Sequence, residues 1–385
     1  MIQLFMKFIY ILLFFASLVF ANIAGIPNDY EIKGRFAPNK ECVRCHLDIY
    51  MEFKQSKHKN TNILNNPIHK AMFKTNPLSK QNRYTCAKCH SPTSKNINDI
   101  AKGKKLLNNK NKEDTQGISC AYCHRIESIK QHNKEYKNII SKQKLRYFSK
   151  RKQILDSPFH DVNTTNQQFN NGNICLACHT QHTKEKNLVS KKNQMYCVFS
   201  NSNDKGENKN NNKQNCITCH MPQIEGSLSD RLDTATHAYH GFAGIGKDSF
   251  MLNKYVDMNI SKSGDGFDIT ITNNSTHDLL LHPIRGLYLK VSIQKDGKTV
   301  KTFKTIEFKK ETIQTKQKPL SWLECSLSYK NTIKPKQTKE YFFKYILSKN
   351  DIVTAKLLYK QIRDKIAKKA KLKKAKFMLF KEIKR

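Results

Sequence analysis

The sequence predicts an α+β protein: a mainly helical, loop-rich N-terminal domain, then a small antiparallel β-sandwich and a C-terminal helix. Five C-x-x-C-H motifs lie between residues 42 and 220, with little regular hydrophobic periodicity between them. Beyond about residue 246 the motifs end, and short segments alternate apolar and polar residues with period two, as strands do. Near the C-terminus apolar residues recur at a spacing of four, which is typical of an amphipathic helix.

Residues 1–21 have the pattern of a signal peptide. Lys7 supplies a positive charge, residues 8–20 are continuously apolar, and Val19 and Ala21 are small residues at a site of the kind that signal peptidases cut. The apolar run is shorter than a comfortable membrane span. We therefore expect cleavage after Ala21 and export to the periplasm, with an uncleaved anchor as the alternative.

Ten of the 12 cysteines belong to the motifs. The motif cysteines are Cys42, Cys45, Cys86, Cys89, Cys120, Cys123, Cys175, Cys178, Cys216 and Cys219, and the histidines that follow them are His46, His90, His124, His179 and His220. This spacing attaches c-type haem, because two thiols add to the vinyl groups on one macrocycle edge and the next histidine binds the iron. A redox dithiol, a zinc site and a disulfide framework are the alternatives, and none requires a histidine after every motif. The sequence therefore predicts five covalently bound haems c.

Histidines outside the motifs are candidates for the second axial ligand that low-spin haems take. Of the 14 histidines, five belong to the motifs, which leaves nine. We favour His58, His240 and His160, in that order, followed by His132 and His277. The others, for which structural or surface roles compete with ligation, are His69, His182, His237 and His282. There is no C-x-x-C-K motif in the sequence, so a lysine-ligated catalytic haem is not indicated.

The charge of the chain is strongly positive, with 69 Lys and Arg against 31 Asp and Glu, a formal net charge of +38. Such a surface attracts acidic proteins, anionic lipid or small anions. Nucleic acid is the usual partner of a basic chain, but export argues against it. Lysine and asparagine are abundant in every stretch, and haem propionates would offset part of the charge, so a compositional habit also explains the excess.

Several segments resemble the cytochrome c-554 (cytochrome c-552/4) family. Residues 41–58 (ECVRCHLDIYMEFKQSKH) resemble its opening, residues 117–126 (GISCAYCHRI) its third haem site and residues 216–222 (CITCHMP) a late site. The resemblance implies that His58 ligates a haem other than the one at Cys42.

Two later segments are similar to larger members of that family. Residues 240–244 (HGFAG) are similar to their His-x-Phe-x-Gly element, which implies that His240 is a ligand. Residues 273–286 (NNSTHDLLLHPIRG) are similar to the segment that opens a C-terminal β-domain, but residues 279–282 depart from the usual pattern. That departure weakens the case for His277 as a ligand.

Four parts of the chain are expected: a signal peptide (1–21), a pentahaem domain (22–245), a β-sandwich (246–350) and a basic amphipathic helix (351–385). Strands are expected at 267–272, 287–293, 300–308 and 341–347, with a hairpin at Asp296-Gly297. The sandwich is expected to cover haem edges and to present a docking surface.

The C-terminal segment and the two remaining cysteines leave alternatives open. The helix expected from Leu358, Ile362 and Ile366 could pack on the sandwich or lie on an anionic membrane surface. Cys197 and Cys325 could form a disulfide, be buried singly or be reactive, because sequence does not give their separation. Residues 200–215 are of low complexity and are expected to form a loop.

Three functions fit these features. The favoured one is a periplasmic electron carrier between a membrane quinol-linked donor and a terminal redox partner, as in anaerobic respiration. The second is an oxidoreductase that acts on a small nitrogen or sulfur oxyanion at one haem with an open position. The third is a haem relay whose β-domain docks a partner protein. Oligomeric state is not set by the sequence.

Overall fold

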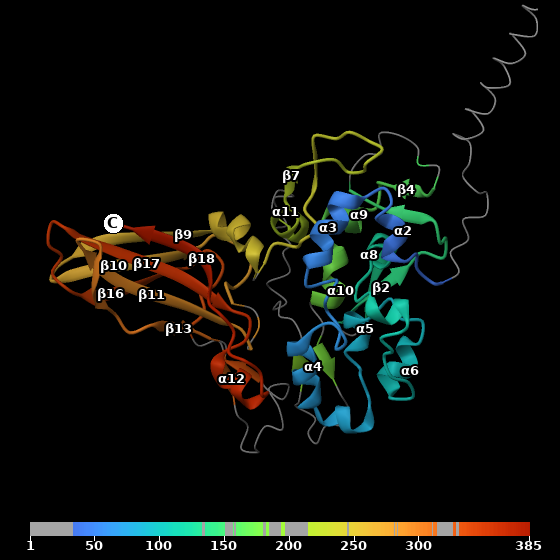
Figure 1. Cartoon of the computed structure of the whole chain (residues 1–385), viewed down its shortest axis with the longest axis horizontal. Coiled ribbons are helices and arrows are strands. Elements are labelled where there is room, and N and C mark those ends of the chain that lie inside the picture. The colour runs from blue at the N-terminus through green and yellow to red at the C-terminus, as the bar shows by residue number, and fades with distance from the viewer. Residues whose placement is uncertain are drawn as a thin grey trace, which may run out of the picture.

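Two parts of the chain lie beside each other, an N-terminal domain of short helices and a C-terminal β-sandwich (Figure 1). The computed structural model describes residues 34–132, 135–150, 157, 159–179, 182–184, 194–196, 215–244, 246–280, 282, 284–309, 311–313, 326–328 and 331–385. The predicted signal peptide, Cys197, Cys325 and nearly all of the predicted 200–215 loop lie outside these residues. Within them, no helix is both long enough and apolar enough to cross a membrane.

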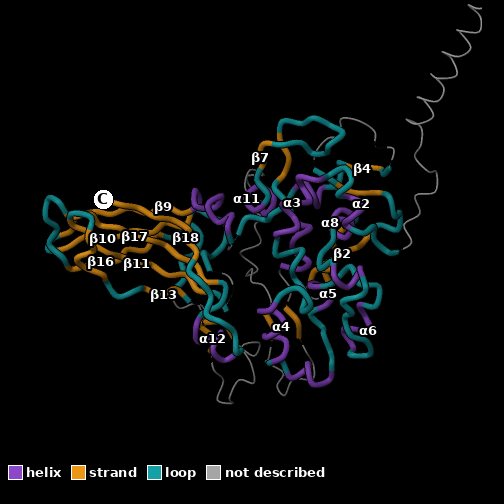
Figure 2. Tube along the Cα trace, viewed as in Figure 1, coloured by secondary structure: helices purple, strands orange, loops and turns teal. Residues whose placement is uncertain are grey.

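The N-terminal domain is built from short helices joined by loops (Figure 2). The α-helices are α2 (Asn39–Cys42), α3 (Leu47–Gln55), α4 (Pro67–Lys74), α5 (Ala87–His90), α6 (Ile97–Lys102), α7 (Lys112–Thr115), α8 (Cys120–His124), α9 (Gln167–Asn170), α10 (Leu176–His179) and α11 (Cys216–His220), and the 3-10 helices are η1 (Pro77–Gln81) and η2 (Asn173–Cys175). A short helix, α2, α5, α8, α10 or α11, overlaps each of the five motifs.

Local caps explain why two motif helices begin where they do. The Ser119 side chain accepts a hydrogen bond from the Tyr122 N–H at the start of α8. At the start of α11 the Asn215 side chain likewise accepts hydrogen bonds from backbone N–H groups. Thr218 Oγ1 accepts the Asn215 N–H in turn, which completes a capping box. Each cap directly precedes the first cysteine of its motif, so the cap fixes the turn that presents both thiols and the histidine.

Short strand pairs that were not predicted fill the rest of this domain. They are β1 (Ile126–His132) with β2 (Glu135–Ile140), β3 (Arg146–Phe148) with β4 (Asp161–Asn163), β5 (His182–Lys184) with β6 (Gln194–Tyr196), and β7 (Gln223–Glu225) with β8 (Thr236–Ala238). The apolar clusters among them are small, for example Phe36 with Ala37 and Ala121. Among the residues that the structure describes, the largest apolar core lies instead in the β-sandwich.

The sandwich consists of two antiparallel sheets. One sheet has the order β16 (Thr338–Lys344), β10 (Gly266–Asn273), β9 (Val256–Ser263). The other has the order β12 (Lys298–Thr302), β11 (Gly286–Lys295), β17 (Asp351–Lys360), β18 (Met378–Lys384), with β13 (Ile306–Phe308) also paired to β11. A separate pair is β14 (Glu311–Ile313) with β15 (Ser326–Ser328). The α+β class is confirmed, and strands occur in each predicted strand region.

The predicted hairpin turn joins β11 to β12. Asp296 and Gly297 have φ values of 49° and 75°, the left-handed pair that a two-residue hairpin turn requires. On β10 the side chains of Phe267, Ile269 and Ile271 are all fully buried, as the period-two pattern predicted.

The prediction of one helix over residues 351–385 is wrong. This segment forms β17, the short helix α12 (Asp364–Lys369) and β18, which places both strands in the second sheet. Two periodicities overlap here: Val353, Ala355 and Leu357 bury one face of β17 with period two, while Leu358 and Ile362 also fit a spacing of four. Pairing with β11 along the whole of β17 decides between them.

The C-terminal part is fixed to the N-terminal domain through α12, and a 3-10 helix leads into the sandwich. Met72 of α4 packs with Ile362 and Ala367 in one buried cluster, so α12 fixes the sandwich to the N-terminal domain. The 3-10 helix η3 (Lys247–Tyr255) leads into β9, and its Ser249 hydroxyl donates to the Leu379 carbonyl on β18. The predicted boundary near residue 246 therefore falls at the start of η3, which packs against the sandwich.

Removal of the Phe267 ring should make the sandwich less stable. Phe267 is fully buried, with its ring centroid 5.4 Å from Phe343 and 5.7 Å from Phe303. We expect Phe267→Ala to lower the free energy of unfolding by about 3–5 kcal/mol, measured by urea denaturation with far-ultraviolet circular dichroism. Phe342→Ala is the matched control, because that ring is 51% exposed on the neighbouring strand. Equal losses in the two variants would contradict the assigned core.

Candidate functional site

The five motifs lie together in the N-terminal domain. Their ten cysteines are partly accessible and are not joined by disulfides. The hydrogen-bonded thiol pairs from different motifs are Cys42 with Cys120, Cys89 with Cys178, and Cys175 with Cys216. These contacts put the first motif beside the third, the second beside the fourth, and the fourth beside the fifth.

The fourth motif is a junction in this arrangement. Besides its contacts with the second and fifth motifs, its Cys175 lies near Cys123 of the third motif. Burial raises the pKa of Cys123 to about 12, and the hydrogen bond from Cys175 lowers the pKa of Cys216 to about 7. The five motifs thus form one continuous series.

Each motif histidine faces the ring of a second histidine. The pairs, with the distances between ring centroids, are His46 with His160 at 6.4 Å, His124 with His240 at 6.1 Å, His179 with His58 at 5.9 Å, His220 with His277 at 5.9 Å and His90 with His69 at 4.1 Å. Four of the five second rings, His58, His160, His240 and His277, are among the five histidines that the sequence favours as ligands.

Four of the pairs have the separation that one iron between two imidazoles needs. A histidine nitrogen binds a transition metal at about 2 Å and lies roughly 1 Å from its own ring centroid, so the centroids should be about 6 Å apart. The four pairs at 5.9 to 6.4 Å fit this spacing. The fifth pair, His69 with His90, is closer at 4.1 Å, and both rings hydrogen-bond to Thr61.

Backbone carbonyls orient most of these rings. The Nδ1–H of His46 donates to the Leu228 carbonyl at 2.7 Å, and that of His124 donates to the Phe148 carbonyl at 2.8 Å. Among the second rings, Nδ1 of His240 donates to the Ala238 carbonyl at 2.6 Å. A bond at Nδ1 fixes the tautomer that leaves Nε2 free to bind a metal.

Two of the second rings lack such a bond. Nδ1 of His58 and Nδ1 of His160 are buried and have no hydrogen-bond partner among the residues that the structure describes. Burial lowers the pKa of His58 to about 3 and that of His240 also to about 3, with neighbouring histidines adding to the effect. These imidazoles are therefore neutral at physiological pH, which is the form that binds a metal.

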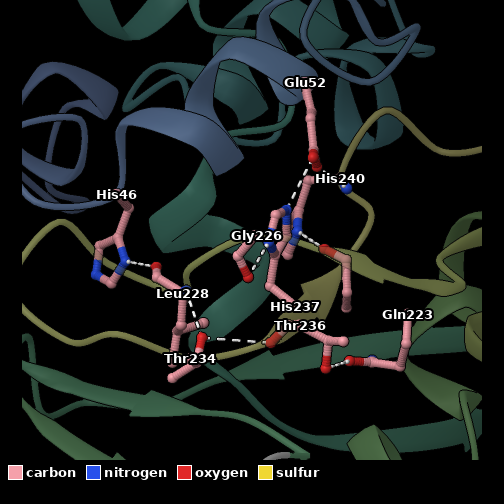
Figure 3. A network of polar contacts seen from close by, with 10 residues as sticks. His46, Glu52, Gln223, Gly226, Leu228, Thr234, Thr236, His237 and His240 are labelled. Carbon is pink, nitrogen blue, oxygen red and sulfur yellow. Dashed lines mark hydrogen bonds and ion pairs between the residues drawn. The ribbon is translucent and has the colours of Figure 1, made fainter.

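A polar network connects α3 to the segment that carries His240 (Figure 3). The Glu52 carboxylate accepts the His240 backbone N–H at 2.7 Å, and its other oxygen lies 2.8 Å from Nε2 of His237. Nδ1 of His237 lies 3.0 Å from the Gly226 carbonyl, and the His237 side chain is only 2% exposed. Glu52 thereby anchors the backbone of His240 from a distant helix.

The loop between β7 and β8 supports the first motif in the same network. Leu228, whose carbonyl holds His46, donates its own N–H to Thr234 Oγ1 at 2.8 Å. The Asp230 N–H donates to the Cys45 carbonyl at 2.8 Å. One hairpin therefore positions a motif histidine at one end and His240 at the other (Figure 3).

The backbone of His58 is fixed by the residues before the third motif. The Ile118 N–H donates to the His58 carbonyl at 3.1 Å. Gly117 has a φ of 65°, and a Cβ placed there would approach the carbonyl oxygens of Lys59 and His58 to 2.5 and 2.8 Å. Only glycine fits at this position, because the conformation and the close contact both exclude a side chain.

Other histidines fall outside these pairs. His237 belongs to the Glu52 network, and Nδ1 of His282 accepts the Ile284 N–H. His132 ends β1 and His182 begins β5, but their side chains lie outside what the structure describes. As a candidate ligand, His69 ranked below His132 in the sequence analysis. No local sequence feature indicates that a histidine in α4 will face His90. A search of the described residues for clusters of three or more metal-binding side chains finds none.

Comparisons with known proteins concern the family of one segment and the fold of the chain. Residues 41–125 match the protein-family model described as cytochrome c554 and c-prime. Among solved structures, a penta-heme cytochrome c552 from Thermochromatium tepidum is similar, with a TM-score of 0.67, 18% identity and coverage of 91% of this chain and 99% of that chain. A search of curated proteins gives no significant match. Residues 41–125, which include the first three motifs, therefore bear out the predicted family resemblance, and the fold of the chain is similar to that of the penta-heme cytochrome.

The Glu52 network should contribute strongly to stability. In Glu52→Ala, the buried His237 ring and the His240 N–H lose their acceptors, so we expect a loss of about 2–4 kcal/mol in the free energy of unfolding. Glu52→Gln should lose far less, because an amide can accept from the His240 N–H and donate to Nε2 of a neutral His237. Asp48→Ala, at an exposed position of the same helix, is the control. Chemical denaturation of the three variants measures the difference, and similar losses in the alanine and glutamine variants would contradict the network.

The contact of Gly117 with His58 can be separated from backbone strain. Backbone strain at positive φ alone costs about 1–3 kcal/mol. Gly117→Ala should destabilise the protein by more than this, because the steric clash adds to the strain. Gly264→Ala is the matched control, since Gly264 has a φ of 48° and nothing within 4 Å of an added Cβ. Unfolding midpoints of the two variants compare the costs. Equal destabilisation of the Gly117 and Gly264 variants would mean that the clash at residue 117 is relieved at no cost in stability.

Proposed function

We propose that this chain, whose residues 41–125 are of the cytochrome c554 and c-prime type, carries five haems c and serves to transfer electrons. The observation that carries the proposal is that all five motif histidines face a second imidazole. A haem iron with two histidine ligands is low-spin and has no position for substrate, which suits electron transfer.

The proposed ligands follow from these pairs. Each haem is attached through the two cysteines of its motif and ligated by the motif histidine. The opposite ligands, in motif order, are His160, His69, His240, His58 and His277. Bound iron would supply one-electron chemistry at each pair, while the protein residues hold the imidazoles in place.

The adjacency of the motifs supports electron movement through the whole domain. Contacts between thiols of neighbouring motifs place the macrocycle edges that they would hold side by side. Electrons could enter at the first or second motif and reach the fifth through the fourth, since the fourth motif touches the second, third and fifth. The fifth pair includes His277, which belongs to the sandwich, so the series ends at the contact between the two parts.

We also propose an exported, periplasmic location, with a quinol-linked donor and a terminal redox protein as partners. The apolar N-terminal segment after Lys7 and the need to attach c-type haem outside the cytoplasmic membrane support this location. The formal charge of +38 favours acidic partner surfaces. Residues 351–385 are mostly strands, so a long amphipathic helix on a membrane surface no longer supports membrane contact.

One observation favours the second function, a reductase of small nitrogen or sulfur oxyanions. The His69 and His90 rings are 4.1 Å apart, about 2 Å closer than one iron between them allows. If either ring fails to bind, the haem of the second motif would keep an open position.

Haem content and spin state test the proposal directly. We expect five haems per chain by pyridine haemochrome assay, and only low-spin signals in low-temperature electron paramagnetic resonance of the oxidised protein. The reduced protein should not bind carbon monoxide. A high-spin signal from one haem would favour the reductase instead, and fewer than five haems would contradict the assignment.

Single substitutions then assign the ligands. Each of His58→Ala, His69→Ala, His160→Ala, His240→Ala and His277→Ala should convert roughly one haem of the five to a high-spin state. His132→Ala tests the ranking of His132 above His69, because a high-spin signal in that variant and not in His69→Ala would restore the sequence-based ranking.

A further inference from the structure

One short segment contacts three of the imidazole pairs. The His240 ring faces His124 at 6.1 Å, and the Phe242 ring lies 4.0 Å from the His58 ring. The Ala243 carbonyl accepts from Nδ1 of His220 at 2.5 Å, and the Ala243 N–H donates to the His220 carbonyl. The conformation of residues 240–243 therefore affects the third, fourth and fifth motifs together.

Phe242 has an unusual backbone in this segment. Its φ is 58°, in the left-handed region that aromatic residues seldom adopt. Such a conformation costs free energy and persists only when surrounding contacts require it. Here the segment is held on both sides, by Glu52 at the His240 N–H and by His220 at Ala243. The constrained backbone directs the Phe242 ring onto His58.

The His58 ring has no hydrogen bond to orient it. Nδ1 of His69, His240 and His277 each bonds to a backbone carbonyl. Nδ1 of His58 is buried without a partner in the described part of the chain. His58 instead packs edge-to-face against Phe242, with an interplanar angle of 73°.

His160 follows the same rule. Its Nδ1 is likewise buried without a hydrogen-bond partner among the described residues, and its ring packs edge-to-face against Tyr147 at 5.1 Å. The second rings of the five pairs are thus held in two ways, by a carbonyl at Nδ1 or by an aromatic ring. The contact of Phe242 with His58 is the tighter of the two aromatic contacts, by about 1 Å between centroids.

We propose that Phe242 is a positioning residue that holds the His58 imidazole opposite His179. The inference rests on the proposed function, in which this pair ligates the haem at Cys175 and Cys178. The Ile118 N–H fixes the His58 backbone, so the side-chain torsions are what remain to be set, and the Phe242 ring sets them. Without that ring, His58 turns away and the haem iron becomes open to a small neutral ligand.

Loss of His58 from the haem of the fourth motif would affect several neighbouring motifs. The fourth motif contacts the second, third and fifth motifs, so a change in its ligation affects every route between them. Phe242 thereby protects the junction of the series from outside ligands and keeps it suited to electron transfer.

The test compares Phe242→Leu with two matched variants of the full-length, haem-loaded protein. Phe242→Tyr keeps the ring and should keep His58 in place. Phe169→Leu removes another ring that lies beside a motif histidine, 5.8 Å from His124, whose Nδ1 is held by the Phe148 carbonyl. The readouts are haem per chain, electron paramagnetic resonance of the oxidised protein, and carbon monoxide titration of the reduced protein.

We expect Phe242→Leu to bind all its haems but to show a high-spin signal from roughly one of them and to bind about one carbon monoxide per chain. Phe242→Tyr and Phe169→Leu should behave like the unsubstituted protein. Low-spin, carbon monoxide-inert haems in Phe242→Leu would overturn the proposal, as would loss of haem from both the leucine and the tyrosine variants. A high-spin signal already present in the unsubstituted protein would instead count against the proposed function.

Discussion

The constraint on which the N-terminal domain depends is that each motif histidine must face a second imidazole from elsewhere in the chain. Motif helices such as α8 and α10 are one turn long, so they cannot bury an apolar stripe of their own. The apolar clusters between them are small. Positions of the loops and strand pairs are therefore decided by where the second rings must lie, as the hairpin that holds both His46 and His240 shows. This explains why a domain with so little regular periodicity has a defined fold.

The parts of the fold that could be predicted are those whose signal is local. The alternation along β10 and the Asp296-Gly297 turn identify the sandwich, because burial of one sheet face and a left-handed turn each leave a mark within a few residues. The C-terminal segment could not be predicted, because its apolar residues satisfy two periods at once. Only the pairing of β17 with β11, more than fifty residues earlier in the chain, selects the strand. The small strand pairs of the N-terminal domain leave no local signal either.

For the candidate site, the chemistry could be predicted and the partnerships could not. The C-x-x-C-H spacing identifies thiols and motif histidines because all three must reach one macrocycle. Which second ring faces which motif is a long-range property: His58 lies opposite His179, and His69, in a capped helix, lies opposite His90. The supporting residues are still harder to find, since Glu52 is an ordinary helical glutamate until His237 and His240 are brought against it. Gly117 shows its role only once the His58 carbonyl lies beside it.

The sandwich takes part in the site and does more than cover it. His277 follows β10, and the Asn273 side chain at the end of that strand donates to the His277 carbonyl at 2.8 Å. Since β10 contributes Phe267, Ile269 and Ile271 to the apolar core of the sandwich, the backbone beside the ring facing His220 is supported by a well-packed unit. The neighbouring fourth pair is supported in the opposite way, by one aromatic ring on an imidazole without a hydrogen bond. Adjacent sites of similar ring spacing thus differ in how firmly the second imidazole is held. Because a hydrogen bond at Nδ1 also increases the basicity of a histidine ligand, haems held at these two pairs would differ in reduction potential.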